Sequence, residues 1–192
     1  MRTAKIKRKT KETQIQVTVA LDGRGSSTNR TGIRFLDHML DAFATHSLID
    51  LEVTAEGDLK HHVVEDVALA VGLGLNEALG DRMGIHRFGH AIVPMDDALA
   101  VAAVDLVRRP YASIQLQLER SMLEDTHRED LEHFLPSLTT TLEATVHVKI
   151  LEGRNDHHKV EAAFKAFARA FGNAIATDPK RSNRLPSSKG IM

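Results

Sequence analysis

The sequence predicts an α+β protein made of an internally duplicated unit. Each half is expected to form a small sheet packed on two helices, and the halves are expected to be related by a pseudo-twofold axis. Two observations support this fold class. The motif His-His-x-x-Glu occurs at 61–65 and again at 157–161, about half a chain length apart. Around it, both halves follow the order strand, helix, strand, helix, which indicates a repeated α+β unit.

The two halves are predicted to form a single domain over 1–192. The repeats cover about 1–90 and 91–180, and no segment with the composition of a linker separates them. Each half alone would bury only a thin core, so the two are expected to share one. A basic tail over 177–192, which contains Pro and Ser, follows the second repeat.

The first half begins with a strand and a helix. Apolar and polar residues alternate over 15–21, which is typical of a strand. The segment 22–32 is rich in Gly, Ser, Asn and Thr and is predicted to be a loop. Apolar residues at helical spacing over 35–43 predict a helix with a buried face. Alternation over 48–53 then indicates a return strand.

The first motif opens a long helical pattern that continues over 63–79. Gly72 and Gly74 interrupt it; they weaken the helix or allow another element to pack closely against it. Two apolar strands are expected next, over 91–93 and 98–107.

The second half repeats this order. A strand is predicted over 114–118, a polar loop over 120–128, a helix over 131–142 and a further strand over 144–151. The last element is a strongly amphipathic helix over 160–175, which begins within the second motif.

The repeated motif predicts metal binding. On a helix the first His and the Glu share a face at i and i+4, whereas the second His is rotated by about 100°. Adjacent histidines therefore cannot easily serve one ion. We expect two metal sites, each built from parts of both repeats or of neighbouring subunits. An acid-His pair precedes each motif, at Asp37-His38 and Glu132-His133. Imidazoles with carboxylates suit a borderline-to-hard divalent ion, and the matched repetition argues against solvated surface histidines.

The composition narrows the function. The chain has no cysteine, which excludes disulfides, iron-sulfur clusters and thiolate zinc sites and fits a cytoplasmic location. Its net charge of -1 gives no reason to expect nucleic-acid binding. No apolar run approaches the roughly 18 residues of a membrane span, so no membrane partner is expected.

The chain resembles the imidazoleglycerol-phosphate dehydratase family of histidine biosynthesis. Each matching segment is weakly specific by itself, whereas their shared order and spacing are highly specific. In addition to the two motifs, the matching segments are 10–13, 32–40, 84–89, 95–99, 109–111, 132–134, 164–170 and 186–190.

The resemblance implies a metal-dependent, cytoplasmic homo-oligomer of 24 subunits, with two Mn²⁺ per active site and metal sites between subunits. The ligands that it implies are His38, His61, His62, Glu65, His133, His157, His158 and Glu161. The motif geometry had already singled out these eight residues.

The implied reaction converts D-erythro-imidazole glycerol phosphate to imidazole-acetol phosphate and water. Metal bound to the substrate imidazole would favour its deprotonated form, which can expel the neighbouring hydroxyl before a carboxylate takes the proton. Glu12 resembles the family's substrate-contacting glutamate. His46 would contact substrate hydroxyls or shuttle protons, and Glu65 and Glu161 could shift between ligand and base.

The substrate phosphate requires cations and hydrogen-bond donors. Arg87, Arg109 and Lys189 lie in matching segments, with Ser187 and Ser188 as further donors. Arginine suits bidentate phosphate binding, and lysine supplies a point charge.

The chain departs from the family pattern at two places near these residues. The connection before His61 is shorter than usual, which affects the expected placement of that ligand. Arg108 stands where glycine is common and is expected to alter phosphate binding. His147 competes as a metal ligand but has no counterpart in the first repeat, so we interpret it as a strand histidine.

Two other functions are consistent with parts of the pattern. In a zinc hydrolase of the inverted zinc-protease type, the helix would need histidine where Asp66 and Ala162 stand. The second alternative is a non-catalytic metal-binding assembly protein, for which Glu12 and the phosphate-type cations would have no use.

Overall fold

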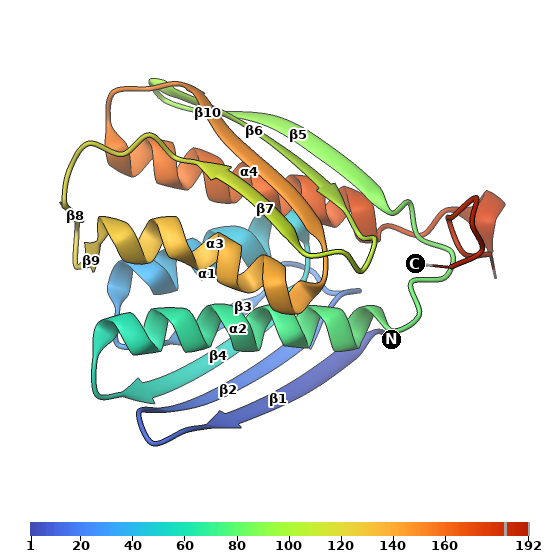
Figure 1. Ribbon diagram of the computed structural model, residues 1–192, viewed down its shortest axis with the longest axis horizontal. Coiled ribbons are helices and arrows are strands. Elements are labelled where there is room, and N and C mark those ends of the chain that lie inside the picture. Colours follow the sequence, from blue (N-terminus) through green and yellow to red (C-terminus); the bar gives the residue numbers. More distant parts are fainter. Residues whose placement is uncertain (183, 192) are drawn as a thin grey trace.

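The computed structural model describes residues 1–182 and 184–191. In this part of the chain, four helices lie between two four-stranded sheets (Figure 1). The first half contains β1 (Thr3–Lys9), β2 (Thr13–Ala20), β3 (Ser27–Arg30), α1 (Arg34–Ser47), β4 (Asp50–Gly57) and α2 (Lys60–Leu79). The second half contains β5 (Phe88–Met95), β6 (Ala98–Asp105), β7 (Tyr111–Gln115), β8 (Met122–Leu123), β9 (Thr126–His127), α3 (Arg128–Leu142), β10 (Thr145–Glu152) and α4 (Asp156–Ile175), followed by the short 3₁₀ helix η1 (Pro179–Arg181).

The two sheets have the same topology, which confirms the duplicated α+β unit. The first has the order β1-β2-β4-β3 and the second the order β5-β6-β10-β7. In both, the first three strands pair antiparallel and the last pair is parallel. A pseudo-twofold relation between the halves follows from this order.

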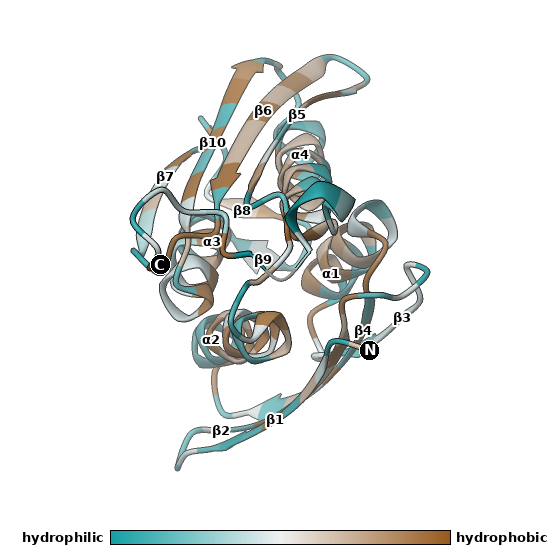
Figure 2. Cartoon of the chain, turned by 90° about the vertical axis from the view of Figure 1, so that its right-hand side faces the viewer, coloured by the Kyte–Doolittle hydropathy of each residue, from teal (hydrophilic) through white to brown (hydrophobic). Residues whose placement is uncertain are grey.

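The helices of the two halves pack against each other in crossed pairs. In Figure 2, α1 and α2 lie beside the first sheet and α3 and α4 beside the second. Between these layers α1 contacts α4, and α2 contacts α3. The aromatic rings of Phe43 on α1 and Phe167 on α4 stack with centroids 5.3 Å apart in the shared core. No helix among the described residues has the length and apolar character needed to cross a membrane.

Besides the two-residue strands β8 and β9, which lie in the predicted loop 120–128, two strands were not predicted from the sequence. β1 presents only Ala4 and Ile6 to the core, while the intervening lysines face outward, so its alternation is weak. β3 was predicted to be loop because it has no apolar residue; it is an edge strand held by parallel pairing with β4. The strand predicted over 114–118 lies instead at Tyr111–Gln115, with only its last two residues inside the predicted range.

A buried arginine binds groups at the C-terminal ends of α2 and α3. Arg82 is fully buried and donates to the carbonyls of Leu142 at 2.7 Å and Glu143 at 3.0 Å and to the side chain of Asn76. These carbonyls at the end of α3 have no intrahelical partner, and a cation there is favourable. Burial lowers the pKa of Arg82 to about 10, so it stays charged near neutral pH.

The helical glycine Gly72 allows the close approach of α2 and α3. A Cβ built there would lie 2.3 Å from the carbonyl oxygen of Leu138. We expect Gly72→Ala to lower the free energy of unfolding by about 1–3 kcal/mol, because the helices must separate. The midpoint of urea unfolding of the metal-free protein measures this. Gly74→Ala is the matched control, since its nearest contact is a Val19 methyl at 3.2 Å; an equal loss in both variants would contradict the expectation.

Candidate metal centre and anion pocket

The first turns of α2 bring His61 and Glu65 to one face, and α3 places His133 opposite them. We call these three residues the α2–α3 cluster. The Nε2 atom of His133 lies 3.5 Å from Glu65 Oε1, and the rings of His61 and His133 have centroids 6.3 Å apart. All three side chains are about half exposed. The cluster thus combines the motif of the first half with a histidine of the second.

His38, His157 and Glu161 form the corresponding α1–α4 cluster. The Nε2 atoms of His38 and His157 lie 3.8 and 3.5 Å from Glu161 Oε2. The candidate ligand atoms all fall within 4.8 Å of one another. Burial raises the pKa of Glu161, but the Lys165 ammonium at 2.8 Å and the two histidines outweigh this effect and lower the pKa. Glu161 therefore presents an ionised carboxylate to the cluster.

The second histidine of each motif faces away from these clusters, as the helical geometry predicted. His62 Nδ1 lies 2.8 Å from Asp58 and 3.8 Å from Glu12. His158 Nδ1 lies 2.6 Å from Asp97. The hydrogen bond that His62 donates to the Asp58 carboxylate raises the pKa of His62. The connection before His61 leads into a helix that begins at Lys60 and places Asp58 beside the second histidine.

The donor set fits a divalent ion. All four motif histidines have a carboxylate at Nδ1, which leaves Nε2 available as a ligand, as in protein sites where a carboxylate orients a metal-bound histidine. Each cluster offers two imidazoles and one carboxylate, a combination that suits Mn²⁺ or Zn²⁺. The four pairs are His61 with Asp130, His62 with Asp58, His157 with Glu124 and His158 with Asp97.

Glu12 and His46, predicted as substrate or catalytic residues, lie outside both clusters. Glu12 is in the turn between β1 and β2, close to His62, and is more than half exposed. His46 is in the last turn of α1 and half-buried. Burial, together with the cations Lys165 and Arg169, lowers the pKa of His46, which keeps its imidazole neutral near pH 7.

The five predicted phosphate residues gather around one pocket of about 290 Å³. The five are Arg87, Arg109, Ser187, Ser188 and Lys189, and the pocket is also lined by Val107, Arg108 and Ile191. Three segments far apart in the sequence thus supply cations and hydroxyl groups to the same pocket.

Within this pocket, Arg87 anchors the C-terminal segment. Its Nε and Nη2 atoms donate to Asp105 at 2.7 and 3.1 Å, and Nη1 donates to the carbonyl of Pro186 at 2.9 Å. Ser187 in turn donates to the carbonyl of Ile191. Of the five predicted phosphate residues, Arg109, Ser188 and Lys189 are exposed, so Arg87 mainly fixes the position of the segment that carries two of them.

Arg108 turns its guanidinium toward the ends of two helices. Its Nη2 donates to the carbonyl of Gly80 at 2.6 Å, and its Nη1 lies 3.4 Å from Glu143. The residue has a φ of 55°, a left-handed conformation that favours glycine. Arg108 therefore borders the pocket while its charge is engaged with α2 and α3.

The two histidine–carboxylate clusters and the anion pocket lie at opposite ends of the folded molecule. Arg108 contacts Gly80 at the C-terminal end of α2, whereas His61 and Glu65 lie in its first turns. A helix of 20 residues is about 30 Å long. Figure 1 shows the same separation, with the C-terminal segment opposite the starts of α2 and α4. A small molecule cannot touch both places on one chain.

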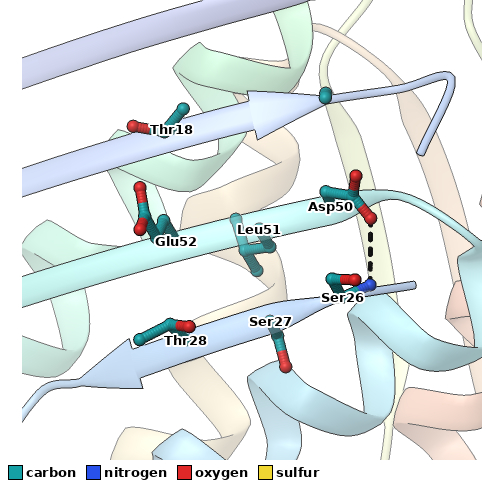
Figure 3. A pocket seen from close by; sticks show the side chains of 8 residues that line it. Thr18, Ser26, Ser27, Thr28, Asp50, Leu51 and Glu52 are labelled. Carbon is teal, nitrogen blue, oxygen red and sulfur yellow. Dashed lines mark hydrogen bonds between the residues drawn. The ribbon is translucent and has the colours of Figure 1, made fainter. Parts of the chain in front are cut away.

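Other sequence candidates lie outside these sites. His147 is on the outer face of β10 near Tyr111, with ring centroids 5.5 Å apart. Asp66 pairs with Arg8 at 2.9 Å instead of facing a cluster. A separate hollow along β2, β4 and β3 is shown in Figure 3; of its two carboxylates, Asp50 and Glu52, the first is engaged by backbone N–H groups, including that of Ser26 at 2.9 Å.

Sequence reasoning missed the carboxylates at Nδ1 and the lysine beside Glu161. Asp130, Asp97 and Glu124 come from elements distant in sequence from the histidines that they contact. Lys165, at i+4 from Glu161 on a predicted helix, and Asp58, four residues before His62, left signals that spacing could have identified.

The duplicated fold, the two imidazole–carboxylate clusters and the cationic pocket define a class of α+β protein equipped to bind cations and an anionic ligand. The model of the family described as imidazoleglycerol-phosphate dehydratase matches residues 31–171. The chain belongs to the imidazoleglycerol-phosphate dehydratase family. It is accordingly an enzyme of the hydro-lyase class, which decides against the zinc-hydrolase and non-catalytic interpretations.

Individual relatives align with all or nearly all of this chain. The imidazoleglycerol-phosphate dehydratase of Methanothermobacter thermautotrophicus is 47% identical over 195 residues, covering 100% of this chain and 98% of that protein. The chloroplastic enzyme of Pisum sativum is 47% identical and is covered over 69% of its length. Among solved structures, the enzyme of Pyrococcus furiosus has a TM-score of 0.84 at 38% identity, with 97% of this chain and 100% of that chain covered. The Staphylococcus aureus enzyme has a TM-score of 0.84 at 34% identity, with 92% and 99% covered.

Proposed function

We propose that the chain is a metal-dependent dehydratase that converts D-erythro-imidazole glycerol phosphate to imidazole-acetol phosphate and water in L-histidine biosynthesis. The observation that carries this proposal is the pair of clusters, each with two imidazoles and one carboxylate, on a chain of the dehydratase family. The cationic pocket supplies the complementary binding site for a phosphorylated substrate.

The proposed cofactor is two Mn²⁺ per active site. One ion would be held by His61, Glu65 and His133, and the other by the three residues of the α1–α4 cluster. When bound, the ions supply Lewis acids that favour the deprotonated form of the substrate imidazole. Three protein ligands leave coordination positions open at each ion. His62 and His158 face away from the clusters of their own chain, so they are available as further ligands in the clusters of a neighbouring subunit.

An active site shared between subunits follows from the separation of clusters and pocket. Because about 30 Å of α2 lies between them on one chain, a neighbour must bring its pocket to the clusters. We therefore propose a cytoplasmic homo-oligomer, of 24 subunits, in which metal binding and assembly are linked. The residues proposed for the phosphate are Arg109, Ser188 and Lys189, with Arg87 and Ser187 holding the segment in place.

The proton transfers are assigned to Glu12, His46 and the carboxylates of the clusters. The proton lost from the substrate imidazole would go to the neighbouring hydroxyl, which leaves as water; Glu12 would then take the carbon-bound proton and return it as the resulting enol becomes the ketone. His46, kept neutral by burial and nearby cations, can pass a proton between substrate hydroxyls. Lys165 holds Glu161 as the carboxylate, and Glu65 is exposed enough to exchange between ligand and base.

Turnover of imidazoleglycerol phosphate by the chelator-stripped protein, measured with and without Mn²⁺, tests the proposal. We expect activity only after Mn²⁺ is added, together with binding of two ions per subunit. Sedimentation of both forms shows whether assembly accompanies metal binding. Full turnover by the stripped protein would contradict metal dependence, and metal uptake without turnover would contradict the proposed substrate.

A further inference from the structure

We infer that Asp130 is a positioning residue of the α2–α3 cluster: it holds His61 through Nδ1 and so presents Nε2 to the divalent ion. This inference rests on the proposed function and deepens it. Asp130 belongs neither to the repeated motif nor to the ligands that the sequence predicted. It enters through the packing of α3 on α2.

The hydrogen bond itself is short and protected. Asp130 Oδ1 lies 2.6 Å from His61 Nδ1, and the Asp130 side chain is only 2% exposed. A buried carboxylate requires a compensating donor, and His61 Nδ1 is the side-chain donor that the described residues provide. A neutral imidazole carries one donor and one acceptor nitrogen. With Nδ1 donating to Asp130, Nε2 becomes the acceptor and therefore the ligand.

The place of Asp130 on α3 adds a second constraint. Asp130 and His133 are at i and i+3, so they share a face of this helix. The same face thus supplies one ligand, His133, and the carboxylate that orients another, His61, on α2. Asp130 also lies in the first turn of α3, where the N-terminal end of the helix dipole stabilises a carboxylate.

The other motif histidines have more exposed partners. Glu124, which contacts the pseudo-equivalent His157 at 3.2 Å, has 60% of its side chain exposed. Asp58 and Asp97 are also substantially exposed. Water competes for exposed pairs, which contribute little to side-chain order. Asp130 is therefore expected to have the largest effect of the four carboxylates.

The test compares Mn²⁺ affinity in assembled, full-length variants by competition with a metal chelator. Asp130→Asn keeps the side-chain shape but replaces the charged acceptor with a neutral amide that can also turn a donor toward Nδ1. We expect about 10–100-fold weaker binding of one of the two ions, the usual effect of removing such a partner. Glu124→Gln should give a smaller change, and Glu129→Gln, an exposed neighbour on the same helix, should give none.

The outcomes separate this inference from the proposed function. If the unaltered protein binds no Mn²⁺, the proposed function fails and the inference fails with it. If the unaltered protein binds two ions and Asp130→Asn binds both equally well, only the inference is overturned. A lower unfolding temperature of metal-free Asp130→Asn with unchanged affinity would also overturn it, because Asp130 would then serve stability alone.

A measurement on the unaltered protein covers the case in which Asp130→Asn does not fold. Solid-state ¹⁵N NMR of the histidine-labelled, metal-free protein at pH 8 reports which nitrogen of each neutral imidazole carries the proton. The His61 signals are assigned by their loss in His61→Gln. Protonation at Nδ1 is the expected result, and protonation at Nε2 would overturn the inference.

Discussion

Replacement of Glu161 by glutamine is expected to lower kcat/KM by at least about 10³-fold, equivalent to about 4 kcal/mol, and to remove one ion per subunit. Glu161 supplies the one carboxylate of the α1–α4 cluster, between His38 and His157. Its replacement would also leave the Lys165 ammonium without its partner at 2.8 Å. An uncompensated cation beside the site opposes binding of a divalent ion. Steady-state kinetics with metal analysis of the purified protein measures both effects.

Glu77→Gln is the matched control for this substitution, because Glu77 is an exposed residue near the far end of α2. It should leave turnover and metal content unchanged. Glu65→Gln should behave like Glu161→Gln, since it removes the carboxylate of the other cluster. Two bound ions and undiminished turnover in Glu161→Gln would refute the assignment of Glu161 as a ligand.

Arg109→Ala is expected to raise KM by about 10–100-fold with metal content unchanged, because a charge-assisted hydrogen bond contributes about 1.5–3 kcal/mol. Arg109 is an exposed arginine of the anion pocket, whereas Arg87 is engaged with Asp105 and Pro186. Inorganic phosphate should inhibit the unaltered enzyme competitively, and it should inhibit the variant more weakly. Initial rates over a range of substrate concentration give KM directly.

The adjacent Arg108→Ala provides the control. Its guanidinium contacts Gly80 and Glu143, so KM should change much less. Equal increases in KM in the two variants would mean that general loss of positive charge, not a contact of Arg109, weakens substrate binding.

Much of the fold could be predicted because its main signals are local. Apolar residues recur at helical spacing in α1, α2 and α4, and apolar and polar residues alternate in β2 and β10. Both patterns can be recognised within short windows of sequence. β1 and β3 escaped prediction because their pairing with neighbouring strands, and not their own apolar residues, defines them. Likewise, the separation of neighbouring histidines followed from helical geometry alone.

The grouping of the candidate ligands depended on packing that the sequence does not encode locally. His38 precedes the first motif along the chain, yet it lies beside residues of the second motif, including His157. Likewise, His133 precedes the second motif but lies beside His61 of the first. Spacing would have paired each histidine with the motif that follows it. Asp130 was unpredictable for the same reason, since only the contact between α2 and α3 brings it to His61.

The crossed helix pairs have an evolutionary consequence. Each cluster takes ligands from both halves, so an ancestral protein of one half would have formed such a cluster only as a homodimer, with two identical centres. After fusion of two gene copies into one chain, the residues of the two centres can change independently. Divergence is visible at corresponding positions: four residues after the motif glutamate stands Lys165 in one copy and Leu69 in the other. One centre could thereby acquire a fixed cation while the other remained without it.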